Sequence, residues 1–464
     1  DLFLAYSDRP GPNDIRRGAV YRFDTASGEW ANVSPPRPPN QGGGFAGVSV
    51  ARDAPGVVVV STMDVWPDEI YRSTSGGDCW TAVGPRAQHD VRGADWVRFG
   101  GNDPSATGWM GDIEIDPYDA SRVLYITGQG IWWSDDVAAA DVALPTSWSF
   151  LNDGLEETVA LGLVSPPAGA RLLSAVGDIA GFRHDDFSIS PPGGMYENPR
   201  FGNTTSIDFA ETLPSRVVRS GTNNARRGAF SDDGGSTWTP FGSEPPGGNG
   251  EGPIAISPDG ARIVWDPRGA GPHYSTDQGQ TWTPSSGVMP PDGNTGALVA
   301  DRVDPLVFYA RSGGDVFVSQ DGGATFTQAG SYAQGGGGNG GARLRTVFGN
   351  AGHVWVSSNG GLWRSTDGAA TFERIEAVSS APALGFGQAA PGATYPALYL
   401  AGSVNGQVGL YRSIDAGASW VAIHDAANRF GFINHITGDP RQFGRVYLGT
   451  GGRGILVGDP VAAP

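Results

Sequence analysis

The sequence predicts an all-β protein: a seven-bladed β-propeller with Asp-box repeats, preceded by the last two blades of a second, N-terminal propeller. Three observations lead to this prediction. A Ser-x-Asp-x-Gly-x-Thr-Trp motif recurs at nearly constant spacing. Apolar and polar residues alternate in short runs that are separated by the turn residues Gly, Pro and Asp, and no amphipathic helix pattern occurs. We expect residues 1–100 to form the two N-terminal blades, the first of them incomplete, and residues 101–464 to form the C-terminal propeller.

The repeated motif is expected to be a turn. Its clear copies begin at Ser231, Ser275, Ser319, Ser365 and Ser413. The resulting spacings of 44, 44, 46 and 48 residues suit blades of four strands. Ser and Asp side chains accept hydrogen bonds from backbone N–H groups in turns, Gly allows positive φ, and the final aromatic residue can be buried between sheets. Acidic motifs can also bind calcium or act in catalysis, but we interpret these as structural.

Each repeat is expected to supply four strands in order. An apolar strand such as 113–117 comes first, and a β-branched and aromatic strand such as 122–127 follows. A third strand then leads into the Asp box, and a short fourth strand follows it. Repeats that complete the C-terminal ring are expected to end near Trp148, Ser190, Trp238, Trp282, Phe326, Phe372 and Trp420. A last strand pair, within 435–458, is expected to close the ring.

The N-terminal hundred residues follow the same pattern. Residues 45–83 read as one full blade, residues 1–34 as most of another, and 89–107 as a connector rich in Gly, Asp and Pro. An unpaired inner strand edge promotes aggregation. We therefore expect the rest of the N-terminal propeller to precede residue 1.

Composition narrows the function classes. The formal net charge of −17 disfavours nucleic acid and anionic membrane surfaces as partners. No apolar run approaches the roughly 18 residues of a membrane span, and the single Cys79 cannot form an internal disulfide. No cofactor or metal site is expected. The 73 glycines and 35 prolines suit a chain with many tight turns.

One segment departs from the repeat and carries the candidate chemistry. Residues 174–187 read SAVGDIAGFRHDDF and place Asp178 on a turn flanked by glycines. On a Gly-flanked turn, a sugar could approach this carboxylate.

The strings around this segment resemble glycoside hydrolase family 74, whose members cleave xyloglucan and consist of two tandem seven-bladed propellers. The similar strings are 165–170, 177–186, 201–208, 385–399, and 436–440 through 451–455. The resemblance extends over essentially the whole chain. One departure is Ala180, where the family usually has a second glycine in Gly-Asp-Ile-Gly-Gly.

The resemblance implies an inverting mechanism in which two aspartates, one from each propeller, act across a cleft. Asp178 matches the proton donor. Such a donor must keep its proton until it reacts, and desolvation by Ile179 and Phe182 would favour that. The family's base lies in a similar Asp-Ile-Gly-Gly string of the first propeller, and residues 1–100 contain no such string. We therefore expect the base upstream of this chain and the chain alone to be inactive. The family's reducing-end-specific members carry a blocking loop near the connector. Residues 96–108 show no such insertion, which predicts endo cleavage of the β-1,4-glucan backbone.

Further candidates for substrate binding are Arg183, His184 and several aromatic residues. Arg183 could orient a carboxylate or pair with Asp185, and His184 with its acidic neighbours is more commonly a structural network than a metal site. Sugar platforms are usually aromatic, and we expect Trp66, Trp132 and Tyr196 to contact substrate, with Trp96, Trp109 and Trp133 as weaker candidates.

Two other classes remain open from the residues alone. An Asp-box sialidase would need an arginine triad and a Tyr–Glu pair, and arginines are plentiful here. A non-catalytic propeller that only binds a partner is the second, although its receptor type normally carries a cysteine-rich companion. We expect a secreted, extracellular enzyme whose partner is a polysaccharide.

Overall fold

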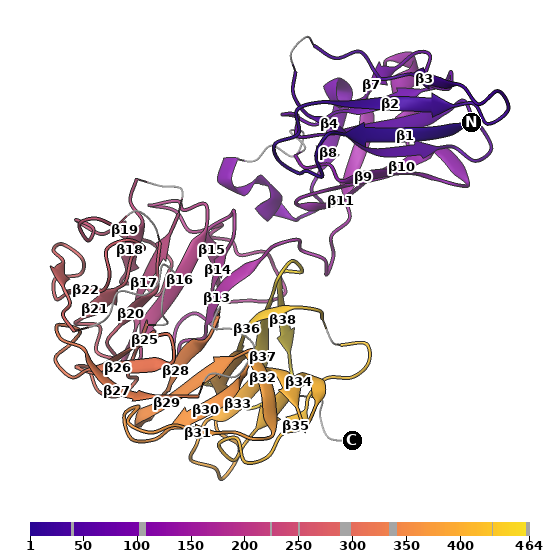
Figure 1. The fold of residues 1–464 in the computed structure, drawn as a ribbon. Helices are drawn as coiled ribbons and strands as arrows, with labels where there is room; N and C mark the ends of the chain where they lie inside the picture. The colour runs from indigo at the N-terminus through magenta and orange to yellow at the C-terminus, as the bar shows by residue number, and fades with distance from the viewer. Residues whose placement is uncertain are drawn as a thin grey trace. The chain divides into compact units, whose positions relative to one another are not determined.

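The computed structural model describes residues 1–38, 41–101, 108–222, 225–248, 251–287, 298–333, 341–428 and 430–460. The chain separates into two compact units, Asp1–Glu157 and Thr158–Pro464. Both consist of small sheets of short, mostly antiparallel strands (Figure 1). In the described part of the chain, no helix is long and apolar enough to cross a membrane.

The unit Asp1–Glu157 contains three sheets among its described residues. The first is β1 (Leu2–Ser7), β2 (Gly18–Phe23) and β3 (Trp30–Asn32), and the second is β4 (Gly44–Val50), β5 (Val58–Met63), β6 (Ile70–Ser73) and β7 (Thr81–Ala82). The third has the order β8 (Ala87–Asp90), β12 (Thr146–Phe150), β11 (Gly130–Ser134), β10 (Asp119–Thr127) and β9 (Asp112–Asp116). The described residues of this unit also form three short 3₁₀ helices: η1 (Gly84–Arg86) between β7 and β8, η2 (Asp95–Gly101) between β8 and β9, and η3 (Val137–Val142) between β11 and β12.

The boundary between the units lies later than the sequence led us to expect. The sheet that ends at Phe150 was assigned to the C-terminal ring, but it shares a core with the second sheet, where Val59 and Ile70 pack with Ile113 and Trp148. Polar contacts join the same two sheets: the Ser49 hydroxyl donates to Glu114 at 2.7 Å, and Arg72 pairs with Asp141 at 3.0 Å. The expected break at residue 100 is therefore replaced by one after Glu157.

Part of the expected connector also forms regular secondary structure. Within 89–107, β8 continues to Asp90 and pairs in parallel with β12, and η2 follows. Residues 102–107 of the expected connector lie outside the described residues.

In the unit Thr158–Pro464, the described residues form seven sheets (Figure 1). The sheets are, in order: β13 (Ala160–Val164), β14 (Leu172–Val176) and β15 (Gly181–His184); β16 (Thr204–Ala210), β17 (Leu213–Gly221), β18 (Gly228–Ser231) and β19 (Thr239–Pro240); β20 (Ile254–Ile256), β21 (Ile263–Trp265), β22 (His273–Ser275) and β23 (Thr283–Pro284); β24 (Leu298–Ala300), β25 (Phe308–Ser312), β26 (Asp315–Ser319) and β27 (Thr327–Ser331); β28 (Arg343–Val347), β29 (Asn350–Ser358), β30 (Gly361–Ser365) and β31 (Glu373–Arg374); β32 (Val378–Gly387), β33 (Ala397–Val404), β34 (Gln407–Ser413) and β35 (Val421–Ala422); β36 (Ile433–Gly438), β37 (Val446–Thr450) and β38 (Ile455–Gly458).

These seven sheets are the blades of a closed ring. The first strand of each blade contacts the first strand of the next, and β36 of the last blade contacts β13 of the first. Arg441 joins the ends, because its guanidinium donates to the Arg171 carbonyl at 2.8 Å. Asn434 also donates to the Ala160 carbonyl, at 3.2 Å. The prediction of a seven-bladed C-terminal propeller is confirmed, with the ring built from Thr158 onward.

The Asp boxes are turns between the third and fourth strands of their blades. In the box after β18, the Ser231 hydroxyl donates to Asp233 at 2.8 Å and accepts from the Gly235 N–H at 2.8 Å. Asp233 in turn accepts from the N–H and the hydroxyl of Thr237, at 2.8 and 2.6 Å. The other four clear boxes repeat the Ser-to-Asp and Thr- or Ser-to-Asp bonds. The boxes are therefore scaffold, as expected.

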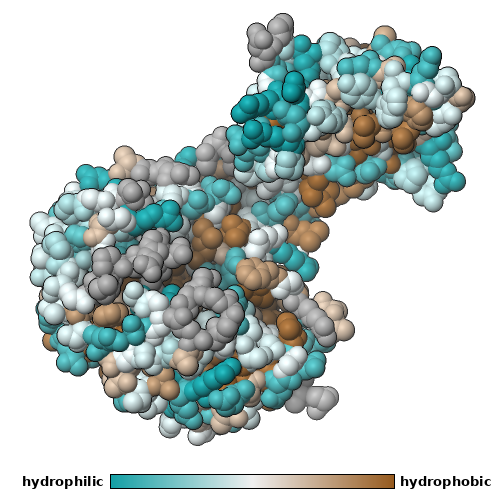
Figure 2. Space-filling model, viewed as in Figure 1, coloured by the Kyte–Doolittle hydropathy of each residue, from teal (hydrophilic) through white to brown (hydrophobic). Residues whose placement is uncertain are grey.

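The core of the ring lies between adjacent blades. The aromatic residues that end the boxes face it: Trp238 and Phe326 are buried, and Trp282 packs against Phe241 and Trp265. Hydrophilic and intermediate residues cover most of the visible face of this unit (Figure 2). Buried aromatic residues between the blades and polar residues on the surface are expected when each sheet buries both faces against its neighbours.

Candidate active site around Asp178

Asp178 lies in the turn between β14 and β15 of the first blade. Its side chain is exposed, and its backbone is left-handed, with φ of 65°. Ala180 is left-handed as well, at 55°, and Gly181 has φ of 143°. Non-glycine residues adopt such conformations at a cost of about 1–3 kcal/mol each, and they cluster at functional sites. The departure from the family's glycine at Ala180 thus places a side chain in a strained position without displacing Asp178 from the turn.

Two glycines make this turn sterically possible. A Cβ added to Gly177 would lie 2.6 Å from the Cγ1 of Val159, and a Cβ on Gly181 would collide with the carbonyl oxygen of Ser174. The positive φ of Gly181 is also one that side chains rarely adopt. The Gly-flanked pattern of the sequence therefore reflects close backbone approach on both sides of Asp178.

Asn203 holds the turn from the next segment. Its side-chain oxygen accepts from the Asp178 backbone N–H at 2.7 Å. The Ala180 N–H donates to the Gly202 carbonyl at 3.2 Å, and Ala180 forms an isolated parallel bridge with Asn203. Asn203 belongs to the string 201–208, but nothing in its local sequence pattern indicates that its side chain reaches a turn 25 residues earlier.

The turn lies at the end of the blade opposite to the Asp boxes. Asp178 precedes the third strand of its blade, whereas the boxes follow the third strands of theirs. The third strand here, β15, runs from Gly181 to His184, and its far end reaches the neighbouring box through Arg183. Asp178 and the boxes therefore lie at opposite ends of the strands within this unit.

The apolar neighbours do not cover the carboxylate. Ile179 and Phe182 are 6% and 7% exposed and pack inside the blade, while Asp178 faces outward. The expectation that these two side chains would desolvate the acid is therefore wrong for this unit. The left-handed backbone at Asp178 turns its side chain away from the core that Ile179 enters.

Arg183 and His184 have structural partners. The Arg183 guanidinium pairs with Asp185 at 2.8 Å and donates to the carbonyls of Asp233 and Gly234 at 2.8 and 3.0 Å. His184 contacts the Ser174 hydroxyl at 2.9 Å, and burial lowers the pKa of its imidazole to about 4 despite the nearby Asp185. Both side chains tie β15 to neighbouring parts of the ring, and their contact with substrate stays a prediction.

Tyr196 and Trp132 are core residues, which corrects their expected role as platforms. Tyr196 is 3% exposed, donates to the Phe182 carbonyl at 2.6 Å and meets Trp238 edge-on at 4.9 Å. Trp132 is 1% exposed and packs against His89 and Phe150 in the Asp1–Glu157 unit. Neither ring face can accept a sugar.

Trp66 remains a platform candidate, because its side chain is 67% exposed. Its ring lies against the backbone at Gly108. Asp68 anchors the loop: it accepts from the N–H groups of Val65 and Met110, both at 3.1 Å, and burial raises its pKa to about 6. These bonds join two irregular segments and fix the backbone on either side of the indole.

The weaker aromatic candidates differ in exposure. Trp109 is 38% exposed, whereas Trp96 packs edge-on against Phe150 at 5.9 Å. The Trp133 indole donates to Asp135 at 2.9 Å and lies under the Arg122 guanidinium. Among the described residues, no three His, Cys, Asp or Glu side chains form a group that could hold a metal ion.

The geometry defines an Asp-box β-propeller with an exposed, strained aspartate on the face away from the boxes. The BNR/Asp-box repeat model matches residues 273–284. A Paenibacillus xyloglucanase is 40% identical over 99% of this chain and 47% of its own length. The crystal structure of the glycoside hydrolase family 74 xyloglucanase from Xanthomonas campestris superposes with a TM-score of 0.84 at 41% identity, covering 99% of this chain and 65% of that one.

A probable oligoxyloglucan-reducing end-specific xyloglucanase from Neosartorya fischeri is 35% identical over 99% of this chain and 65% of its own length. The chain belongs to glycoside hydrolase family 74. It spans between about half and two thirds of the length of these relatives.

Proposed function

We propose that this chain is part of an inverting glycoside hydrolase that cleaves the β-1,4-glucan backbone of xyloglucan in endo mode, with Asp178 as the general acid. The observation that supports it most is the exposed Asp178, held in a left-handed turn by Asn203. Among the described residues of the Thr158–Pro464 unit, Asp178 is the one carboxylate with a positive φ. Backbone strain of this kind clusters at functional sites, and the named members of the family are xyloglucanases, which supports a chemical role.

In the proposed reaction, the Asp178 carboxyl protonates the leaving glycosidic oxygen. A second carboxylate on the opposite side of the sugar activates a water molecule, and the two carboxyl groups stand about 6.5–9.5 Å apart in inverting enzymes. We propose that this base comes from the other propeller of a two-propeller module. Residues 1–100 contain no Asp-Ile-Gly-Gly-type string, which supports that assignment.

The proposed substrate is a neutral polysaccharide. Because a polymer of this kind does not cross membranes, we propose that the enzyme acts outside the cell. Endo cleavage is supported by the short segment 96–108, in which no insertion is present that could close one end of a binding groove. Residues 102–107 of that segment lie outside the described residues, so the proposal rests on their number and not on their structure.

The decisive experiment is Asp178→Asn in the complete enzyme, assayed on xyloglucan. We expect turnover to fall by about 10²–10⁴-fold, the usual contribution of general acid catalysis. A substrate with a strongly acidic leaving group should recover part of the rate, because its departing oxygen hardly needs the proton. Asp186→Asn is the matched control, since Asp186 is exposed on the same segment and only accepts from Ser188; it should retain the parent rate.

Four outcomes would contradict parts of the proposal. Unchanged turnover in Asp178→Asn would remove this residue from the chemistry. Release of sialic acid, with no reducing sugar formed from xyloglucan, would favour the sialidase class. Hydrolysis of xyloglucan by the 464-residue chain alone would place the base within these residues. Uniformly short products in the first minutes would argue against endo cleavage.

A further inference from the structure

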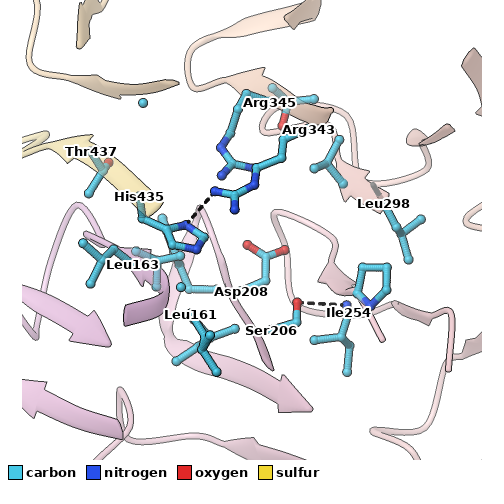
Figure 3. Close-up of a pocket in the computed structure, with 18 of the residues that line it drawn as sticks. Leu161, Leu163, Ser206, Asp208, Ile254, Leu298, Arg343, Arg345, His435 and Thr437 are labelled. Carbon is cyan, nitrogen blue, oxygen red and sulfur yellow. Dashed lines mark hydrogen bonds between the residues drawn. The ribbon is translucent and has the colours of Figure 1, made fainter. Parts of the chain in front are cut away.

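A cavity of about 650 Å³ runs along the axis of the Thr158–Pro464 ring (Figure 3). Its lining includes residues from the first strand of every blade, from Leu161 on β13 to His435 on β36. Asp178 is not among them. The cavity is therefore distinct from the candidate active site.

The lining carries an excess of positive charge. It includes five arginines and three carboxylates: Arg268, Arg302, Arg311, Arg343 and Arg345, with Asp208, Glu211 and Glu251. This local excess is opposite in sign to the chain's formal charge of −17. Because charges interact strongly where water is partly excluded, such an excess is costly unless something neutralises it.

Among the described residues, Arg343 and Arg345 are the neighbouring arginines that contribute to this excess of positive charge without an acidic partner. They lie two residues apart on β28, so both side chains leave the same face of the strand. Figure 3 shows their guanidinium groups beside each other, with His435 facing them from β36. Burial, and then the charges of Arg343 and Arg302, lower the pKa of Arg345 to about 9. Arg343 also contacts the Nδ1 of His435, at 3.3 Å.

The carboxylates of the cavity have other partners. Asp208 pairs with Arg302 at 2.7 Å and accepts from the Ile256 N–H at 3.0 Å. Glu251 pairs with Arg268 at 3.4 Å. Within the described ranges, neither Arg343 nor Arg345 forms an ion pair.

Backbone carbonyls accept hydrogen bonds from only some of the N–H donors of these two guanidinium groups. Arg343 donates to the Asn434 carbonyl, and Arg345 donates to the carbonyls of Leu344 and Leu384 at 3.0 and 3.3 Å. Each guanidinium has five N–H donors, so donors remain for a ligand. Neutral carbonyls do not offset the positive charge, and Asp208, which is paired with Arg302, offsets only part of it at Arg345.

We propose that the axial cavity binds a small multivalent oxyanion between Arg343 and Arg345. Guanidinium forks bind the oxygens of phosphate and carboxylate groups in the same bidentate way. Inorganic phosphate and a tricarboxylate such as citrate share this chemistry. A multivalent anion can neutralise both guanidinium charges at once, which chloride cannot do.

The first test measures thermal unfolding of the complete chain with phosphate, citrate or chloride at equal ionic strength, and titrates phosphate and citrate calorimetrically. We expect phosphate or citrate to raise the Tm more than chloride does. Arg345→Gln should weaken that anion's affinity at least tenfold. Arg268→Gln is the control, because Arg268 lines the same cavity but is paired with Glu251; it should weaken affinity less than threefold. Equal stabilisation in all three salts, or unchanged affinity in Arg345→Gln, would overturn the proposal.

A second test needs no variant and decides the matter if Arg345→Gln does not fold. Crystals of the parent chain are soaked in selenate, a phosphate-sized dianion with an anomalous signal. A selenium peak within hydrogen-bond reach of both Arg343 and Arg345 is the expected result. The absence of a peak there, or a peak only elsewhere on the surface, would overturn the assignment.

Discussion

The side-chain oxygen of Asn203 accepts a 2.7 Å hydrogen bond from the backbone N–H of Asp178, and so fixes the peptide that carries the candidate acid. The bond reaches from the segment before β16 to the turn before β15. It orients the backbone of Asp178 and leaves the carboxylate free to react. Under the proposed mechanism Asn203 is a positioning residue, and its removal would separate turn geometry from acid chemistry.

Asn203→Ala should lower kcat of the complete enzyme on xyloglucan by about tenfold or more, because small misplacements of a catalytic group cost up to about 10²-fold. KM should change little. Asn203→Asp keeps an oxygen acceptor and should retain most of the rate. Steady-state kinetics on purified variants measure both effects. Equal losses in the two variants would show that the hydrogen bond to Asp178 is not what matters.

Gly181→Ala should destabilise the Thr158–Pro464 unit by more than about 2 kcal/mol, because the new methyl group meets the Ser174 carbonyl at a positive φ. Gly169→Ala is the control: it also has a positive φ, 78°, but no atom lies within 4 Å of its added Cβ. That variant should lose only about 1 kcal/mol. Denaturant unfolding of both variants compares steric collision with backbone strain alone.

The Asp boxes predict a loss of stability in acid. Hydrogen bonds from the Thr371 hydroxyl and N–H lower the pKa of Asp367 to about 2. In the other four clear boxes, partial burial opposes the shift, but hydrogen bonds from the turn still lower the pKa of the aspartate. Because the folded pKa is below the unfolded one, this stabilisation is full above about pH 4 and is lost as pH falls toward 2.

Denaturant unfolding at pH 7, 4 and 2.5 measures this dependence. Asp367→Asn should be less stable than the parent at pH 7, and the difference should shrink at pH 2.5. Asp153→Asn, an exposed position outside every clear box, should show no such convergence. A constant difference across the three pH values would mean that the box aspartate does not act through its charge.

Trp66 and Trp132 should respond oppositely to truncation. Trp66→Ala should weaken retention of the complete enzyme on xyloglucan severalfold and change the free energy of unfolding by less than about 0.5 kcal/mol, since its ring is mostly exposed. Trp132→Ala should cost about 3–5 kcal/mol of stability, as expected for a buried tryptophan. Affinity gels and thermal unfolding separate the two effects. Unchanged retention in Trp66→Ala would leave this indole without a binding role.

The sequence was sufficient to predict the propeller and its boxes, because strand alternation and turn residues are local properties. It was insufficient to place the blade that ends at Phe150. That blade has the same strand pattern as those of the ring, and only the packing of its face on Val59 and Ile70 shows where it belongs. Membership of a ring depends on contacts between sheets, which strand patterns do not encode.

The same limit applies to the site. The Gly-flanked string was sufficient to propose Asp178, which the structure shows to be exposed, and its role stays a prediction. Tyr196 and Trp132 were expected to be platforms, but irregular or unusual local sequence does not report burial. Asn203 could not be found at all, since its role depends on a contact across 25 residues.

The placement of Asp178 before a third strand, and of the boxes after the third strands, has a practical consequence for anyone who handles this protein. Fluorophores, immobilisation tethers or fused domains can be attached on the box side of the ring, for example at Ser236, without crowding the acid. The chain contains no lysine, so amine-reactive reagents will not modify its side chains. An engineered cysteine on the box side would therefore add one chosen attachment point beside Cys79, which is exposed, and Cys79 should be replaced first.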